Sequence, residues 1–295
     1  MRKWLKRIGM LLSGLLILIA LFFSYAYFIE PRQFVIVHET LAVPHWDREL
    51  NGFRIVAIAD IHTGSNYAPP ERIRYVVEQA NAQNADLIVL LGDYVSEARW
   101  DRETRSRPEG IDRTDLKVPT EIIAQSLIGL KAKYGVYAII GNHDWYHNEK
   151  KIHQQFEEIA GITVLQNEIF QIDVAGRKVR LWGIEDLYRN RRVPAEPFEQ
   201  LAEKRNVIVL THNPDSLLSA PSGFALMLSG HTHGGQLNWP IFGPRAVFND
   251  PRFMDGLAVV DGKHVYVTSG VGTSVIPLRF RVPPEIAVLT LTAAE

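Results

Sequence analysis

The chain carries the stretch FRIVAIADIHTG at residues 53–64. Its first seven residues are mostly Val, Ile and Ala, and they lead directly into an Asp-x-His cluster at Asp60 and His62. A short apolar run that ends in polar side chains is typical of a buried strand whose carboxyl end faces a ligand site. We therefore expect a strand over Phe53–Ala59 that presents Asp60 and His62 at its end.

The same pattern, a short Val/Ile/Leu-rich run bounded by Gly, Asp or Asn, recurs along the chain. It predicts further strands over Phe34–Glu39, Leu87–Leu91, Val136–Ile140, Val179–Gly183, Val207–Leu210, Ala225–Leu228, His264–Thr268 and Ile286–Leu291. Helices are expected over Pro70–Asn81, Thr120–Leu130, Ile152–Ala160 and Pro197–Glu203. Alternating strands and helices predict an α/β layered fold, and the strand-rich C-terminal third indicates a mixed or doubled sheet.

Composition excludes several classes of protein. The 295 residues are 46% hydrophobic and 22% charged, which excludes global disorder. Lys and Arg number 32 and Asp and Glu number 33, so the net charge is -1 and no nucleic-acid partner is expected. Cysteine is absent, which excludes disulfides, iron–sulfur clusters, thiolate zinc sites and a thiol nucleophile.

An apolar segment lies near the N-terminus. Residues 8–28 carry no charge and read IGMLLSGLLILIALFFSYAYF, and at about 1.5 Å per residue such a helix spans a hydrocarbon core of about 30 Å. Four basic residues precede it, whereas Arg32 is the only Lys or Arg in the fifteen residues after it. The positive-inside rule then predicts a single-pass membrane protein, with its N-terminus in the cytoplasm and its main domain outside.

A cleaved signal peptide is the alternative interpretation of this segment. Ser24 and Ala26 place small residues at the two positions that a signal peptidase requires. The apolar run is long for a signal peptide, and aromatic side chains crowd the candidate cleavage site. An uncleaved anchor is therefore favoured.

Two stretches interrupt the alternation of strands and helices. Ser96–Pro119 is rich in charge and is interpreted as a solvated insertion or a flap. Trp239–Phe253 is a loop broken by Gly and Pro that holds many large apolar residues. It is either a loop packed on the C-terminal strands or an apolar rim that enters the bilayer interface through Trp239, Ile241, Phe242 and Phe248.

Five polar clusters each follow a predicted strand. They are Asp60-Ile61-His62, Gly92-Asp93, Gly141-Asn142-His143-Asp144, His212-Asn213 and Gly230-His231-Thr232-His233-Gly234-Gly235. Each cluster alone could be a turn or a helix cap. Because ligands of layered α/β folds bind at the carboxyl ends of strands, five such clusters predict one shared site.

The residue types in these clusters indicate a metal site. Imidazole and carboxylate without thiolate suit Mn, Fe, Zn or Co. Side chains at i and i+2 of an extended segment point to the same side, so Asp-x-His and His-x-His let two donors converge on one ion, or on two ions about 3.5–4 Å apart. Five other histidines lie outside the clusters and are expected to be structural or on the surface: His38, His45, His147, His153 and His264.

The five clusters, in this order, resemble those of the calcineurin-like metallophosphoesterase superfamily. The resemblance spans Ile55 to about Gly235, and it implies two mixed β-sheets packed as a sandwich and flanked by helices. The apolar N-terminal segment and three short motifs are similar to one branch, the membrane-anchored bacterial phosphodiesterases, which is related to UDP-2,3-diacylglucosamine pyrophosphatases. These motifs are His-Asn-Pro-Asp at 212–215, Gly-Gly-Gln at 234–236 and Pro-Pro-Glu at 283–285.

The resemblance also implies a role for each site residue. One divalent ion would be held by Asp60, His62, Asp93 and His233, and a second by Asp93, Asn142, His212 and His231. His143 would contact the phosphate and stabilise or protonate the leaving oxygen, and Asp144 would orient the His143 imidazole. Mn²⁺ is the favoured metal among Mn, Fe, Zn and Co.

The implied activity is hydrolysis of a phosphodiester or pyrophosphate, including a lipid-linked one, by a hydroxide that bridges the two ions. The implied organisation is a cytoplasmic N-terminus and transmembrane anchor over 1–29, a linker and first strand over 30–52, and the metallophosphoesterase domain over 53–295. A phosphomonoesterase or nucleotidase is the alternative enzyme, and a metal-binding membrane protein without turnover is the alternative of another class. UDP-diacylglucosamine itself is expected in the cytoplasm, so it is incompatible with a domain outside.

Overall fold

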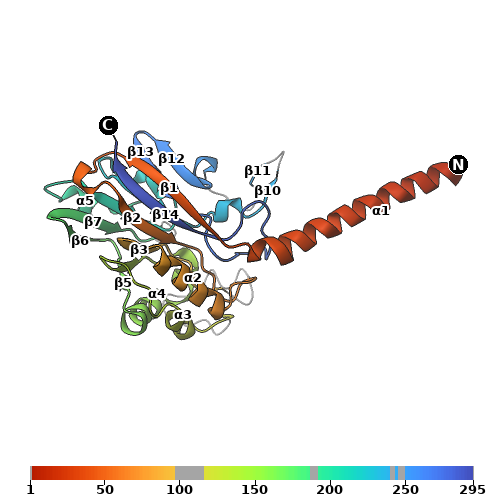
Figure 1. Cartoon of the computed structure of the whole chain (residues 1–295), viewed down its shortest axis with the longest axis horizontal. Coiled ribbons are helices and arrows are strands. Elements are labelled where there is room, and N and C mark those ends of the chain that lie inside the picture. The colour runs from red at the N-terminus through yellow and green to blue at the C-terminus, as the bar shows by residue number, and fades with distance from the viewer. Residues whose placement is uncertain (1, 97–115, 187–191, 240–242, 245–249, 295) are drawn as a thin grey trace.

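Two six-stranded sheets lie face to face in the computed structural model, which describes residues 2–96, 116–186, 192–239, 243–244 and 250–294 (Figure 1). The first sheet has the strand order β1-β14-β2-β3-β4-β5, and the second has the order β12-β13-β9-β8-β7-β6. The strands of the first sheet are β1 (Val35–Val43), β14 (Glu285–Ala293), β2 (Phe53–Ile58), β3 (Leu87–Leu90), β4 (Val136–Ala138) and β5 (Thr163–Val164). Those of the second are β12 (Gly256–Val260), β13 (Lys263–Val267), β9 (Leu226–Ser229), β8 (Val207–Leu210), β7 (Arg177–Gly183) and β6 (Glu168–Val174).

Both sheets are mixed, as the sequence predicted. Strands β2, β3, β4 and β5 run parallel, and β14 joins them antiparallel to β2. In the second sheet β7, β8, β9 and β13 run parallel, with the antiparallel strands β6 and β12 at the two edges. Consequently the carboxyl ends of the parallel strands of each sheet gather at one edge of that sheet.

The alternation of side chains along each strand explains the layers. On β2, Ile55 and Ala57 belong to the apolar layer between the two sheets, together with Leu210 of β8. Between them, Val56 and Ile58 belong to the layer beneath the helices of the first sheet. Because both faces are buried, these strands are apolar runs rather than alternating ones.

Helices cover the outer faces of the two sheets. The first sheet is covered by α2 (Pro70–Ala82), α3 (Thr120–Ser126) and α4 (Asn142–Gln155), which lie on one side of β2 and β3 in Figure 1. In the described part of the chain, the second sheet is covered by the one-turn helices α5 (Glu196–Glu199) and α6 (Ser216–Ser219) and by a 3-10 helix at Pro251–Phe253, whose Phe198, Leu217 and Phe253 pack on it.

Several boundaries differ from those predicted. The helix expected over Ile152–Ala160 begins ten residues earlier as α4, because Gly141-Asn142-His143-Asp144 forms its first turn rather than a loop. The helices expected over Thr120–Leu130 and Pro197–Glu203 end at Ser126 and Glu199. Strands β6 and β12 were not predicted. In β6, which reads EIFQIDV, polar residues interrupt the apolar run, whereas β12 reads GLAVV, a short apolar run that was assigned to no strand from the sequence.

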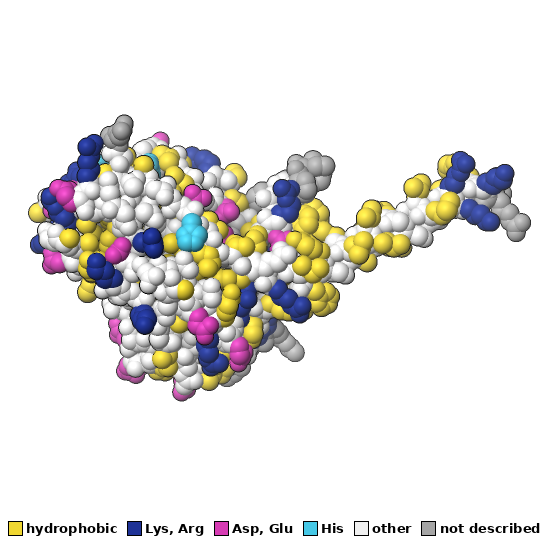
Figure 2. All heavy atoms as spheres, in the orientation of Figure 1, with side chains coloured by type: hydrophobic (Ala, Val, Ile, Leu, Met, Phe, Trp, Pro, Cys, Tyr) yellow, Lys and Arg dark blue, Asp and Glu magenta, His cyan; other side chains and the backbone are white. Residues whose placement is uncertain are grey.

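The N-terminal helix α1 (Arg2–Ser24) projects away from the sandwich (Figures 1 and 2). It belongs to a helical stretch, Lys3–Arg32, that is long and apolar enough to cross a membrane, and its most apolar part is not buried by the rest of the chain. A signal sequence can have the same length and apolar composition as this helix. The segment at 30–52 contributes β1, which pairs in parallel with β14.

The foot of this helix, residues 25–30, is built into the domain. Ala26 is fully buried and its carbonyl accepts a hydrogen bond from the backbone N–H of Arg279 at 2.9 Å. The buried carboxylate of Glu30 accepts one from the backbone N–H of Val282. The Asn66 amide donates to the carbonyl of Tyr27 at 3.0 Å. The direction in which the helix leaves the domain is therefore fixed by contacts.

Aromatic side chains reinforce this junction. Phe22 stacks on Trp239 with ring centroids 4.8 Å apart and contacts Phe280 edge-on at 4.9 Å. Trp239 is one of the four residues proposed for the apolar rim. The other three, Ile241, Phe242 and Phe248, lie outside the described residues, as does most of the Ser96–Pro119 insertion.

These contacts predict that the foot stabilises the domain. A protein of residues 33–295 should unfold with a free energy roughly 2–4 kcal/mol lower than one of residues 25–295, since it loses the buried Ala26 and three hydrogen bonds. Urea denaturation followed by circular dichroism measures both. Equal midpoints and slopes for the two proteins would contradict the structural role of the foot.

Candidate metal centre

The structure brings the five predicted clusters to one place between the two sheets. Asp60 and His62 follow β2, and Asp93 follows β3. Asn142 and His143 open α4 just after β4, while His212 follows β8 and the His231–His233 pair follows β9. Three groups of ligand atoms lie within 4.8 Å of one another: Asp60, His62 and His233; His62, Asp93 and His143; and Asp93, His212 and His231.

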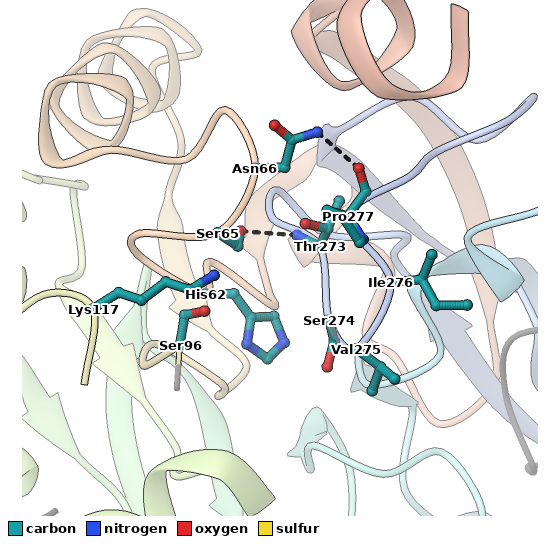
Figure 3. A pocket seen from close by; sticks show the side chains of 10 residues that line it. All are labelled: His62, Ser65, Asn66, Ser96, Lys117, Thr273, Ser274, Val275, Ile276 and Pro277. Atoms are coloured by element: carbon teal, nitrogen blue, oxygen red, sulfur yellow. Dashed lines mark hydrogen bonds between the residues drawn. The ribbon is translucent and has the colours of Figure 1, made fainter. Parts of the chain in front are cut away.

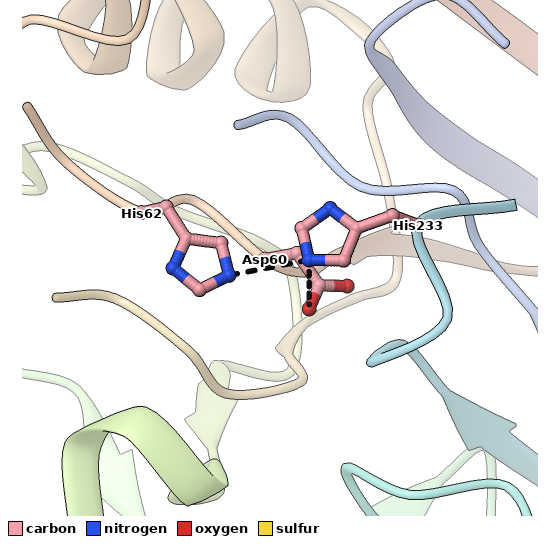
Figure 4. A group of neighbouring side chains, drawn as sticks. All are labelled: Asp60, His62 and His233. Atoms are coloured by element: carbon pink, nitrogen blue, oxygen red, sulfur yellow. Dashed lines mark hydrogen bonds and ion pairs between the residues drawn. The ribbon is translucent and has the colours of Figure 1, made fainter. Parts of the chain in front are cut away.

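The first group is closed by three side chains (Figure 4). The Nε2 atoms of His62 and His233 are 3.2 Å apart, and His233 Nε2 lies 3.5 Å from Asp60 Oδ1. Two imidazole nitrogens and a carboxylate oxygen thus converge in a buried space. Such a set is a typical arrangement of ligands around a divalent cation.

Asp93 belongs to the group that contains His212 and His231, and its carboxylate also reaches His62 of the first group. The Oδ2 atom of Asp93 lies 3.1 Å from His212 Nε2 and 3.6 Å from His62 Nε2. His231 Nδ1 is 3.1 Å from His212 Nε2. One carboxylate therefore stands between two sets of imidazoles, which is the position that a bridging ligand would occupy.

Backbone carbonyls fix the orientation of two of these imidazoles. His62 Nδ1 is 2.9 Å from the carbonyl oxygen of Val95, and His212 Nδ1 is 2.7 Å from that of Leu91. Because a carbonyl only accepts, Nδ1 of each ring carries a proton, and Nε2 is the atom left to coordinate an ion once it is unprotonated. Both rings are thus held in the orientation that a metal ligand requires.

The backbone is strained where it presents these side chains. Five of the seven predicted ligands have a positive φ between 42° and 73°: Asp60, His62, Asp93, His231 and His233. Left-handed conformations are uncommon for residues other than glycine and cost about 1 kcal/mol or more each. The rest of the fold must hold this strain, which is a common property of functional sites.

The pKa values of two histidines in the cluster favour the neutral imidazole, which is the form that binds a cation. Burial and the neighbouring His212 imidazole lower the pKa of His231 to about 3, and burial with the neighbouring His62 holds the pKa of His233 well below its usual range. These two imidazoles are therefore neutral at pH 7. Burial opposes charging of His212 as well, but the Asp93 carboxylate raises its pKa well above the usual value.

Asn142 adds an observation that favours a metal. Its Oδ1 atom is buried and has no hydrogen-bond partner among the described residues. A buried carbonyl oxygen without a partner costs about 1–3 kcal/mol, so it is expected to face a ligand. Carboxylate, imidazole and amide donors together fit divalent ions. This set of residues therefore fits the divalent metal ions that the sequence predicted.

Asp144 accepts four backbone hydrogen bonds. Its Oδ2 accepts from the backbone N–H groups of Asp93 at 2.7 Å and Gly141 at 3.0 Å, and its Oδ1 accepts from those of Tyr94 at 2.8 Å and Val95 at 3.1 Å. These contacts hold the turn that carries Asp93, which is a positioning role. That Asp144 orients the His143 imidazole stays a prediction.

His143 stands at the edge of the cluster. Its Nε2 lies 3.9 Å from Asp93 Oδ2 and 3.4 Å from the hydroxyl of Ser274, and its backbone N–H donates to Asp93 Oδ1 at 2.9 Å. It is buried, on the first turn of α4. It can therefore reach a group bound beside the two ligand sets.

Of the five histidines outside the clusters, only His147 is buried; His38, His45, His153 and His264 are exposed or partly exposed.

A pocket of about 180 Å³ opens beside the first ligand group (Figure 3). It is lined by His62, Ser65, Asn66, Ser96, Lys117 and the segment Thr273–Pro277. Lys117 is exposed and has no acidic partner among the described residues. Sequence reasoning missed Ser274 and Lys117, since neither belongs to a motif. The paired Gly270 and Gly272 were the available signal of close backbone approach.

Arg279 is the other residue that the sequence did not reveal. It is fully buried, and its guanidinium donates to the carbonyls of Gly272, Ser269, Gly270, Val282 and Pro283. The loop that it folds donates in turn from Gly272 N–H to the Asp60 carbonyl at 2.7 Å. Arg279 therefore supports the backbone of a predicted ligand.

Gly270 packs directly on that ligand. Its φ is +70°, and a Cβ there would lie 2.6 Å from Asp60 Cβ. We predict that Gly270→Ala weakens metal binding about 10–100-fold, the loss typical of groups that orient ligands. Gly262→Ala is the matched control, since its φ is +73° and nothing lies within 4 Å. Calorimetric titration of Mn²⁺ measures both, and equal affinities would contradict the role of this contact.

Metal removal should destabilise the domain. At a metal concentration of 100 times Kd, each site contributes about 2.7 kcal/mol, and a domain of this size shifts its Tm by roughly 2–4 °C per kcal/mol. We predict that EDTA lowers the Tm by roughly 5 °C or more in differential scanning calorimetry. In the Asp93→Ala protein, which lacks the shared carboxylate, EDTA should leave the Tm unchanged.

Comparisons with known proteins agree with this geometry. Residues 53–235 match the family model described as calcineurin-like phosphoesterase. The chain is 33% identical over 273 residues to the phosphodiesterase YaeI of Escherichia coli strain K12, covering 91% of this chain and 92% of that protein. It is 29% identical over 281 residues to the uncharacterized metallophosphoesterase YkuE of Bacillus subtilis strain 168, covering 92% and 91%.

A more distant relative comes from Danio rerio. It is named a transmembrane protein with metallophosphoesterase domain, and it is 28% identical over 273 residues. The match covers 88% of this chain and 57% of that protein.

Proposed function

The chain belongs to the calcineurin-like phosphoesterase family and is a metal-dependent phosphoric ester hydrolase, and we propose that it is a dinuclear phosphodiesterase or pyrophosphatase that acts at a membrane surface. One observation carries the dinuclear part. The Asp93 carboxylate stands between two groups of imidazoles, within 3.6 Å of a nitrogen in each. A single ion would leave one of these two groups of imidazoles without a metal to bind.

We assign the ligands as the sequence predicted. Asp60, His62, Asp93 and His233 hold one ion, and Asp93, Asn142, His212 and His231 hold the other. Two divalent ions there supply a Lewis acid for the phosphoryl oxygens and a hydroxide at neutral pH, with Mn²⁺ the favoured metal. The name of YaeI supports diester rather than monoester cleavage.

The chain's own residues complete the reaction. His143 stands beside the shared carboxylate and can donate a proton from Nε2 to the leaving oxygen. The Ser274 hydroxyl lies 3.4 Å from that nitrogen and also lines the pocket. Asp144 fixes the Asp93 turn through four backbone hydrogen bonds, so the shared carboxylate does not have to reorganise during turnover.

The membrane part rests on the N-terminal helix. We propose that residues 1–29 anchor the protein in the bacterial cell membrane as a single pass with a cytoplasmic N-terminus, and that the domain lies outside the cytoplasm. The charge bias around the apolar run supports this topology. The buried foot at Ala26 supports an uncleaved helix, since cleavage there would remove a residue that the domain packs around.

Hydrolysis of bis-p-nitrophenyl phosphate, compared with p-nitrophenyl phosphate, tests the proposal. We expect Mn²⁺-dependent diester cleavage by the full chain. His143→Ala should lower kcat about 10²–10⁴-fold while the metal content is retained, and Asp93→Ala should lose both metal and activity. His153→Ala, on the same helix but outside the cluster, is the control and should keep full activity. Cleavage of the monoester alone would identify a phosphatase instead.

A further inference from the structure

The junction between the helix and the domain exposes an unusual amount of apolar surface. Five side chains form what we call the collar: Tyr27, Phe28, Ile29, Val275 and Ile276, which are 37%, 52%, 48%, 71% and 38% exposed. Figure 2 shows hydrophobic side chains gathered where the helix meets the domain. Contiguous exposed apolar surface of this kind marks a contact site for a protein or a membrane.

Two segments far apart in sequence build the collar, and one residue joins them. The amide nitrogen of Asn66 donates both to the Tyr27 carbonyl at 3.0 Å and to the Pro277 carbonyl at 2.8 Å. The helix end at 27–29 and the loop end at 275–277 are thereby held side by side. Asn66 also lines the pocket beside His62.

The collar and the pocket share residues. Val275 and Ile276 belong to the collar and also line the pocket, whose opposite wall contains the predicted ligand His62. The interior is polar, with Ser65, Ser96, Thr273 and Ser274, and Lys117 supplies a positive charge. The pocket therefore has an apolar rim at the helix foot and an anion-attracting interior beside the predicted metals (Figure 3).

The occupant of the collar follows from its continuity with the helix. The uncharged segment ends at Ile29, just before Glu30, so a bilayer that holds this segment has its interface at the level of the collar. The buried contacts of Ala26 and Glu30 hold the domain against the end of the helix, and therefore close to the bilayer. Exposed Arg32, next to the collar in sequence, adds attraction to anionic headgroups.

We propose that the collar seats the domain on the bilayer that holds its own helix, and that the pocket takes a phosphodiester headgroup from the lipids of that leaflet. This inference rests on the proposed function for its chemistry, and it names the substrate class of the same site. Water adds to the phosphorus, the bond to the headgroup oxygen breaks, and the proton passes to the leaving group, so a lipid phosphate remains in the membrane.

The depth of spin labels in the bilayer tests whether the collar contacts the membrane, and it requires no activity measurement. The chain has no cysteine, so single-cysteine variants Ile29→Cys and Ile276→Cys accept a nitroxide at one place each. Val259→Cys is the control, being 53% exposed on β12 and outside the collar. In vesicles of phosphatidylcholine and phosphatidylglycerol holding the full chain, collar labels should be shielded several-fold from a water-soluble nickel complex. Equal accessibility at all three positions would overturn the seating.

A second measurement tests the substrate class. The probe is dioleoylglycerol p-nitrophenyl phosphate in the same vesicles, whose hydrolysis releases p-nitrophenolate and leaves a phosphatidate. We expect Ile29→Asp to slow this reaction at least fivefold and to leave bis-p-nitrophenyl phosphate turnover in water within twofold of wild type. Val259→Asp should change neither. Equal rates on the lipid for the two variants would overturn the inference, whereas a wild-type protein inactive on the soluble diester would overturn the proposed function.

Discussion

The shared carboxylate of Asp93 is the constraint on which the rest of the site depends. It lies within hydrogen-bonding or metal-bridging reach of imidazoles that come from both sheets. Burying a carboxylate without compensation is costly, and here the compensation comes from His212, which together with His143 holds the pKa of Asp93 well below its usual range despite burial. The face-to-face arrangement of the sheets is what makes this meeting possible, because β2 and β3 deliver ligands from one sheet while β8 and β9 deliver them from the other.

Holding these ligands at one point imposes a conformational cost that surrounding residues must offset. Left-handed backbone at Asp60, His62 and Asp93 is held by close contacts rather than by local preference. Asp144 ties the Asp93 turn through four backbone N–H groups, and Gly270 lets a second loop touch Asp60. Because these groups act on the backbone of a ligand rather than on the metals, their replacement would alter affinity through geometry and not through the loss of a donor.

The sequence predicted the layers and the ligand clusters because both have local signatures. Buried parallel strands are apolar runs, and Asp60 or His212 directly follows such a run. What it could not predict depends on long-range contacts. Edge strand β6 lacks the apolar run, and the role of Asp144 depends on a turn fifty residues away. Arg279 and Ser274 carry no motif at all, and their importance comes only from the loop that folds back onto β2.

The same loop connects the membrane helix to the predicted metal site. The N–H of Arg279 bonds to the Ala26 carbonyl in the helix foot, while its guanidinium holds the carbonyls of Gly270 and Gly272, which contact Asp60. An arginine buried among carbonyls keeps its charge, since its pKa falls only to about 10 through burial. These hydrogen bonds fix how the helix foot is placed relative to the Asp60 backbone. A bilayer that holds the helix would therefore set the orientation of the domain, and with it the direction in which the predicted metal site faces.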